Sequence, residues 1–533
     1  MRLHRSLFAT LSLEVAIVTV ASLSVALASC SSQSPAAAAP TTPADDGGAP
    51  PATTKGPLAL AAGEVGEVTF ADDTATARFT TTGGEKMVVV LASTKLDGTS
   101  STFAYSASAS ADGDDTGVRL VDDCALAPWT AAMPAADPEP SGAGPKVGDT
   151  RSIVVSAGVT HETITAKAAA VGERAIVWVD TTAAHPATME DAFIADFLSD
   201  FEKVILPRER AVFGMESDQD GDGRISLVFT PLTKESAVAF FLGCDLAELD
   251  GCKPGNHGEY LYLTPPADIE PPYNTPAAIK ETLAHELGHL VHFNRKVLRN
   301  KLTAWPDSAY MIEGFGAFAQ DVIGYQAGNL YVAKAGLDQI DDFSIGDVFG
   351  QRDAYDQKRD GLLRGGAYWL VRFLYDRAGG DTMKADGTID GKGGPAAMHA
   401  WLDAPSSVTD GVTGRAAPRP LADVTLDFYT ALAASGGSAT AGLSEPKNAC
   451  FAFAKTNTDP LTTRQRGGDP RASFHGQAMT GPAMKPLASA DKKLRAGGVD
   501  YLTVDVPAGQ TELGLTVKVD AKAAARLRVI RVK

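Results

Sequence analysis

The stretch ETLAHELGHLVHF, residues 281–293, carries two histidines and a glutamate in the order H-E-x-x-H. Thr275 and Pro276 stand shortly before it and favour a helix start, because threonine caps a first turn and proline is tolerated at the first helical position. Apolar residues then recur at three- and four-residue steps: Ile279, Leu283, Leu287 and Leu290. This pattern predicts a helix with one buried face.

His285, Glu286 and His289 fall on one sector of that helix. The two histidines are four residues apart, about 40° around the axis, so both imidazoles can bind one tetrahedral Zn²⁺. Glu286 can reach a water molecule activated by such an ion and act as general base. His292 lies one turn further along and is a candidate to contact a metal ligand without binding the metal itself. An ordinary helix can also contain this short pattern, so the assignment depends on a third ligand.

Glu313 is the candidate third ligand, in the segment WPDSAYMIEGFGAFAQD, residues 305–321. Asp307 or Ser308 can cap a second helix that carries Glu313. The residues around Glu313 are small, which allows this helix to pack closely against the first: Gly314, Gly316, Ala317 and Ala319. The alternative is a glutamate on the surface, but the small neighbours favour contact with a metal.

With these residues the chain resembles the gluzincins, zinc peptidases with H-E-x-x-H and a downstream glutamate, and within them the hyicolysin-like branch. The resemblance extends from about residue 170 to 380 through AIVWVD, SDQDGDGRISLVFTPL, GEYLYLTPP, TLAHELGHLVHF, MIEGFGAFAQD and GGAYWLVRFLYDRAGG. It implies an α+β fold with a mixed sheet followed by active-site helices. It also implies His285, His289 and Glu313 as zinc ligands and Glu286 as the base of a peptidase.

The chain departs from this family pattern at two places. Residues 290–312 form a longer interval before Glu313 than thermolysin-like and aminopeptidase-like relatives have. Aminopeptidase relatives also carry a tyrosine that stabilises the oxyanion, and Leu363 occupies that position here. Tyr355 and Tyr368 are the candidate substitutes. A metzincin is excluded because its pattern needs glycine at 292, where His292 stands.

The first residues predict export. An apolar run at 15–28 follows Arg2 and Arg5, which is typical of a signal peptide over residues 1–29. The run ends in LASC, residues 27–30, which resembles the lipobox of bacterial lipoproteins and implies lipid modification of Cys30. Residues 30–56 have almost nothing to bury and predict a disordered tether. We therefore expect a protein of the bacterial cell envelope, anchored to a membrane and facing the periplasm or the exterior.

The rest of the chain divides by its patterns into three parts. Residues 57–150 alternate apolar and polar residues in short runs and predict a β-sandwich-like module. Residues 151–475 are mixed α/β and hold the peptidase-like segments, including a helix over 189–207 that we expect to stop at Pro207. Residues 476–533 are again rich in strands. They either complete the first sandwich or form a second one.

Cysteines and charge agree with an exported protein. Without Cys30, four cysteines remain; Cys244 and Cys252 flank a short loop and are the easiest pair to close, which leaves Cys124 with Cys450. The net charge of −17 disfavours binding of nucleic acid. The expected partners are a peptide or protein substrate and, through the lipid, a membrane.

The segment SDQDGDGR resembles the first half of a calcium loop, with Asp218, Asp220 and Asp222 as candidate Ca²⁺ ligands. Position 12 of such a loop is Phe229 and not glutamate, so an acidic turn before a strand is the alternative. Five further histidines stand outside any ligand spacing and are interpreted as structural or exposed: His161, His185, His257, His399 and His475.

Together these patterns predict a zinc metallopeptidase that uses a metal-activated water and a glutamate base. Endopeptidase action is favoured, because an aminopeptidase needs a carboxylate for the free amine of its substrate and the sequence identifies none. The alternative hypothesis is a surface adhesin or binding lipoprotein that keeps a peptidase fold without its activity.

Overall fold

The computed structural model describes residues 53–533 except 97–99, 111–112, 135–136, 138, 140–141, 158–159, 236, 249–254, 326–329, 350–358, 408–419, 437–442, 455–456, 472, 475–476 and 489–492. The predicted signal peptide and Cys30 therefore lie outside the described residues, as do Cys252, Tyr355 and His475.

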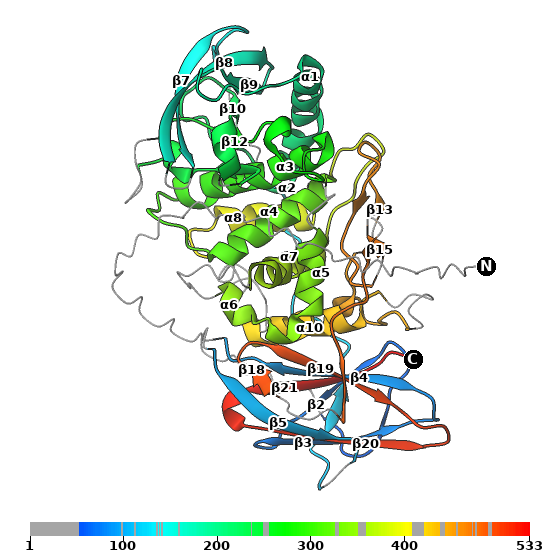
Figure 1. Ribbon diagram of the computed structural model, residues 1–533. Helices are drawn as coiled ribbons and strands as arrows, with labels where there is room; N and C mark the ends of the chain where they lie inside the picture. The colour runs from blue at the N-terminus through cyan, green and yellow to red at the C-terminus, as the bar shows by residue number, and fades with distance from the viewer. Residues whose placement is uncertain are drawn as a thin grey trace, which may run out of the picture.

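The described chain has a mixed α+β fold, as the sequence predicts, arranged in three parts (Figure 1). A sheet formed by β7 to β12 lies at one end of the molecule, and a two-layered set of strands that includes β4 and β20 lies at the other. Helices occupy the space between them (Figure 1). No helix in the described ranges combines the length and the apolar character needed to cross a membrane.

The strands from both ends of the chain build one sandwich. In its six-stranded sheet, β4 (Lys86–Ser93) pairs on one side with β19 (Val499–Asp505) and on the other with β21 (Ala525–Arg531). In its five-stranded sheet, β20 (Glu512–Val519) lies between β3 (Thr74–Thr80) and β5 (Thr102–Ser108). The shorter members are β1 (Leu58–Ala59), β2 (Val65–Val68), β6 (Val118–Leu120), β17 (Lys485–Pro486) and β18 (Lys493–Arg495). The C-terminal strands thus complete the first sandwich.

Strand β4 explains how this sandwich attaches to the rest of the protein. Successive side chains of a strand point to opposite faces. Val89 and Leu91 accordingly join the interior of the sandwich, whereas Val88 and Val90 join the core of the helical region. The sheet is buried on both faces, and its central strand is therefore the continuous apolar run MVVVLA and not an alternating one.

The second six-stranded sheet has the order β11-β12-β10-β9-β8-β7. Its members are β7 (Thr150–Ala157), β8 (Thr160–Val171), β9 (Ala175–Asp180), β10 (Ile225–Phe229), β11 (Ala239–Phe241) and β12 (Tyr260–Leu263). Strands β9, β10 and β12 are parallel, and β11 runs antiparallel to β12. Val177, Leu227 and Leu261 face the helical core, so this sheet supports the helices that carry the H-E-x-x-H motif.

The predicted helix end at Pro207 is wrong. Helix α1 (Asp191–Asp200) continues through a π-helical turn (Phe201–Ile205) into α2 (Leu206–Val212). Pro207 lies in the first turn of α2, where its missing N–H needs no partner. The π-helical turn before Pro207 is wider than an α-helical turn and allows the chain to continue from α1 into α2.

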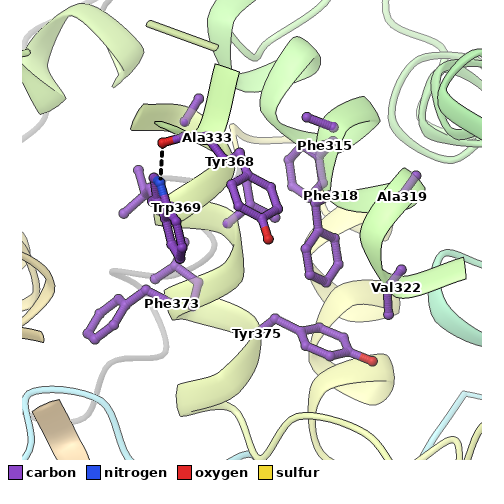
Figure 2. Packing of buried hydrophobic residues seen from close by; sticks show 14 of the residues in the cluster. Phe315, Phe318, Ala319, Val322, Ala333, Tyr368, Trp369, Phe373 and Tyr375 are labelled. Carbon is purple, nitrogen blue, oxygen red and sulfur yellow. Dashed lines mark hydrogen bonds between the residues drawn. The ribbon is translucent and has the colours of Figure 1, made fainter. Parts of the chain in front are cut away.

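The remaining helices of the central region are α3 (Pro276–Phe293), α4 (Ala309–Ile323), α5 (Leu330–Asp338), α6 (Ile345–Phe349), α7 (Asp360–Arg377), α8 (Gly394–Asp403) and α10 (Leu421–Ala434). Figure 2 shows aromatic side chains of α4 and α7 in contact: the rings of Phe318 and Tyr375 are 4.8 Å apart. The indole of Trp369 donates a hydrogen bond of 2.8 Å to the carbonyl of Ala333 and joins α7 to α5 (Figure 2).

The chain leaves the sandwich after β6, although the sequence assigned residues 121–149 to the N-terminal module. Cys124 forms a disulfide with Cys450, which confirms the predicted pair, and Trp129 packs edge-on against Trp401 of α8. Because the disulfide joins residues 326 positions apart, it constrains the unfolded chain strongly.

A buried ionic cluster joins the sandwich to α10. Arg528 of β21 is fully buried; its guanidinium lies 2.7 Å from Asp427 of α10 and 3.3 Å from Glu67 of β2. Burial would raise the pKa of Glu67, but Arg528 and Arg526 together lower it to about 2. Glu67 therefore contributes stability above the ordinary glutamate pKa, and this contribution is lost as the pH falls from 4.5 to about 2.

We expect Arg528→Met to lower the free energy of unfolding by about 3–5 kcal/mol, because it leaves the buried carboxylate of Asp427 without its cation and removes one of the cations around Glu67. Urea denaturation at neutral pH measures this change. The matched control is Arg78→Met in the same sandwich, whose exposed pair with Glu512 is worth at most about 1 kcal/mol. Equal effects of the two substitutions would contradict the role of the buried cluster.

Candidate metal centre

Helix α3 begins as the sequence predicts and is buried along most of its length. The side chain of Thr275 accepts a hydrogen bond of 3.2 Å from the backbone N–H of Ala278, and Pro276 occupies the first turn. His285 and His289 are 4% and 8% exposed, so both imidazoles are held inside the protein. Their ring centroids are 4.5 Å apart and nearly perpendicular.

Helix α4 brings Glu313 to these histidines. Ser308, one of the two predicted caps, accepts a hydrogen bond of 3.2 Å from the N–H of Met311. The two helices approach closely through small residues. A Cβ added to Gly288 would lie 3.1 Å from Ala319, and one added to Gly316 would lie 2.6 Å from the ring of His285. Glycine at 316 is therefore the condition for His285 to occupy its position.

The three predicted ligands lie at distances suited to one metal ion. Oε2 of Glu313 is 3.4 Å from Nε2 of His285, and Oε1 is 3.8 Å from Nε2 of His289. Two ligands of a tetrahedral zinc ion, each about 2.0–2.1 Å from it, are separated by about 3.3 Å. The side chains therefore need little movement to bind such an ion, and their donor set of two imidazoles and a carboxylate is one that zinc accepts.

The protonation states of His289 and Glu313 also favour the binding of a cation. Burial lowers the pKa of His289 to about 3, so this imidazole is neutral and able to bind a metal at neutral pH. Burial would raise the pKa of Glu313, but the net effect of Arg364 and the two histidines is to lower it. Glu313 is therefore a carboxylate when a cation approaches.

Glu286 lies beside the triad and is 9% exposed. Its Oε2 accepts a hydrogen bond of 3.0 Å from the backbone N–H of Phe241 in β11. Burial and the negative charge of Glu313 raise the pKa of Glu286, against the opposing effects of Arg364 and the Phe241 N–H. A carboxylate with raised proton affinity, fixed by the backbone of a strand, is suited to take up a proton.

Arg364 of α7 is a site residue that the sequence reasoning missed. Its guanidinium lies 2.9 Å from Oε2 of Glu313. The available signal was its place in LLRGG, directly after Leu363, where the family's tyrosine position falls. A charged residue among apolar and small ones on a buried helix indicates a buried partner.

Two other candidates have different positions from those expected. Tyr368 is 1% exposed and donates a hydrogen bond of 3.0 Å to Asp321, so it has a structural role in place of the oxyanion role (Figure 2 shows it packed beside Phe315 and Phe318). His292 forms a hydrogen bond of 3.1 Å with Asp307 and thereby joins the end of α3 to the segment before α4. This hydrogen bond holds α3 and α4 together and does not involve His285, His289 or Glu313.

Asp218, Asp220 and Asp222 form the second group of potential metal ligands among the described residues. His161, His185, His257 and His399 belong to neither group in that part of the chain. Cys244 is described, but its predicted partner Cys252 is not, so this pair stays a prediction.

No protein-family model matches the chain, and no curated protein matches it.

The close contact at Gly316 gives a prediction. We expect Gly316→Ala to lower the affinity for a divalent ion such as Zn²⁺ or Co²⁺ by about 10–100-fold, because the methyl group displaces the imidazole of His285. Equilibrium dialysis with Zn²⁺ measures the affinity. Gly361→Ala is the matched control, since among the described residues its new methyl group meets only Ala335, at 3.6 Å. Unchanged affinity in Gly316→Ala would contradict the position of His285 in the site.

Proposed function

We propose that the protein is a zinc-dependent peptidase of the gluzincin type that hydrolyses peptide bonds in proteins. The proposal rests mainly on one observation. The carboxylate oxygens of Glu313 lie 3.4 Å from Nε2 of His285 and 3.8 Å from Nε2 of His289, so three potential metal ligands from two helices meet at one point. The resemblance of residues 170–380 to the hyicolysin-like branch supports the same class.

In this proposal His285, His289 and Glu313 hold the ion. Bound zinc would supply Lewis-acid polarisation of the scissile carbonyl and would lower the pKa of a water molecule. Glu286 takes the proton from the attacking water and delivers it to the leaving amine. The N–H of Phe241 orients the carboxylate of Glu286, and Arg364 keeps Glu313 ionised and oriented toward the histidines.

An extended substrate is favoured by the neighbouring strand. In the described sheet, β11 pairs only with β12, so its other side is an edge, and its Phe241 contacts the proposed base. A peptide segment can add to such an edge through backbone hydrogen bonds, whatever its side chains. This arrangement accepts the interior of a chain as well as its end, and we therefore favour endopeptidase action.

We also propose an envelope location, with residues 1–29 as signal peptide and Cys30 as the lipid-bearing residue. The disulfide between Cys124 and Cys450 supports this part of the proposal, because such bonds persist in oxidising compartments.

The function is tested by zinc content and casein cleavage of the purified chain. We expect one zinc per chain, lost in His289→Ala and kept in the control His161→Ala, whose side chain is exposed. Glu286→Gln should keep zinc and lose about 10²–10⁴-fold in cleavage rate, because only the base is removed. The control Glu173→Gln, at a side chain that is 81% exposed, should cleave normally.

Two results would contradict the proposal. A parent chain that binds zinc and cleaves no protein substrate would favour the inactive adhesin or binding lipoprotein. Cleavage that persists unchanged in Glu286→Gln would exclude the proposed mechanism.

A further inference from the structure

The loop between α2 and β10 gathers three carboxylates that the proposed peptidase mechanism does not use. One carboxylate oxygen from each of Asp218, Asp220 and Asp222 lies within 4.8 Å of the other two. Gly221 and Gly223 have φ angles of 72° and 74°, in the left-handed region that glycine adopts readily. These two glycines let the chain turn tightly enough to direct alternate side chains to one point.

The backbone of the loop already uses one oxygen of each carboxylate. Gly223 donates its N–H to Oδ1 of Asp218 at 3.0 Å, and Asp222 donates to Oδ1 of Asp220 at 3.1 Å. Arg224 donates to Oδ1 of Asp222 at 2.8 Å. The second oxygen of Asp220 lies 3.7 Å from a guanidinium nitrogen of Arg151, whereas that of Asp222 is left for another partner.

The buried carboxylate of Asp222 lacks a partner for one of its oxygens. This residue is only 7% exposed, and its Oδ2 is buried and accepts no hydrogen bond from any described residue. A buried carboxylate oxygen without a donor or cation is costly.

The surroundings add further negative charge. Glu259, directly before β12, is 2% exposed, and its two oxygens accept the N–H of Gln219 at 3.0 and 3.2 Å. The guanidinium of Arg151 lies 3.7 Å from Asp220 and also donates a hydrogen bond of 2.8 Å to the hydroxyl of Tyr260. The guanidinium of Arg224 donates to the carbonyls of Gly172, Gly142 and Asp222. Four carboxylates thus share few positive charges.

We propose that Asp218, Asp220 and Asp222 bind one Ca²⁺ ion, with the buried carboxylate of Glu259 adding negative charge from the neighbouring strand. Oxygen-only ligands at alternate positions of a glycine-containing loop suit Ca²⁺, which accepts six to eight oxygens in flexible geometry. Phe229 stands where an EF-hand has its bidentate glutamate, so water completes the coordination shell and binding is weak, with a dissociation constant of about 10⁻⁴–10⁻³ M.

The ion would fix the start of β10 and β12 in the sheet formed by β7 to β12. The loop leads directly into β10, Glu259 leads into β12, and Arg151 belongs to β7. Calcium that neutralises this cluster stabilises the folded state, because it binds the assembled loop and not the unfolded chain. This site uses none of the residues of the zinc triad and does not depend on the proposed peptidase activity.

Equilibrium dialysis of the purified chain with ⁴⁵Ca²⁺ tests the proposal, with thermal unfolding measured without added Ca²⁺ and in excess Ca²⁺. We expect one bound ion and a higher unfolding temperature with calcium. The double variant Asp220→Asn, Asp222→Asn should bind at least about tenfold more weakly, because the amide oxygens still accept the loop N–H groups while the charge is lost. Asp222→Asn alone gives a second, milder variant if the double variant folds poorly.

Two controls make the result specific. Asp386→Asn changes an exposed aspartate whose Oδ1 likewise accepts a backbone N–H, from Thr388, and should bind Ca²⁺ as the parent does. His289→Ala should also keep calcium, which separates this site from the zinc centre. Absence of calcium binding in the parent, or equal binding in the parent and in Asp222→Asn and the double variant, would overturn the proposal.

Discussion

The close approach of α3 and α4 is the constraint on which the candidate site depends. Gly316 leaves just enough room for the imidazole of His285, and Gly288 faces Ala319 at the same crossing. Larger side chains at these positions would separate the helices and remove Glu313 from the histidines. The hydrogen bond between His292 and Asp307 fixes the connection between the two helices. The close packing of the two helix backbones thus brings the side chains of His285, His289 and Glu313 together.

The rest of the molecule keeps this crossing in place from three sides. Edge strand β11 fixes Glu286 through the N–H of Phe241, and α7 contributes Arg364 to Glu313. On the far side, the sandwich packs Val88 and Val90 into the same core as the helices. The sandwich is therefore a structural base of the helical region and not an appended module.

The sequence predicted the features that local patterns encode. The cap at Thr275, the cap at Ser308 and the meeting of Glu313 with both histidines follow from spacing and residue size. Two features required knowledge of distant contacts: Arg364 meets Glu313 through the packing of α7 on α4, and the pairing of β4 with β19 and β21 belongs to a sheet assembled from both ends of the chain. A third feature is local but was not visible in the apolar pattern: the helical path continues past Pro207 because a π-helical turn precedes it.

The most direct test of the account is the coordination of zinc in the purified chain, measured by X-ray absorption at the zinc edge. The account predicts two imidazole nitrogens at about 2.0–2.1 Å, carboxylate oxygen at about 2.0–2.2 Å and no sulfur. It also predicts that Glu313→Ala changes the oxygen shell and leaves the nitrogen shell in place. Sulfur at about 2.3 Å, or a spectrum that is the same in Glu313→Ala, would contradict the assignment of the three ligands.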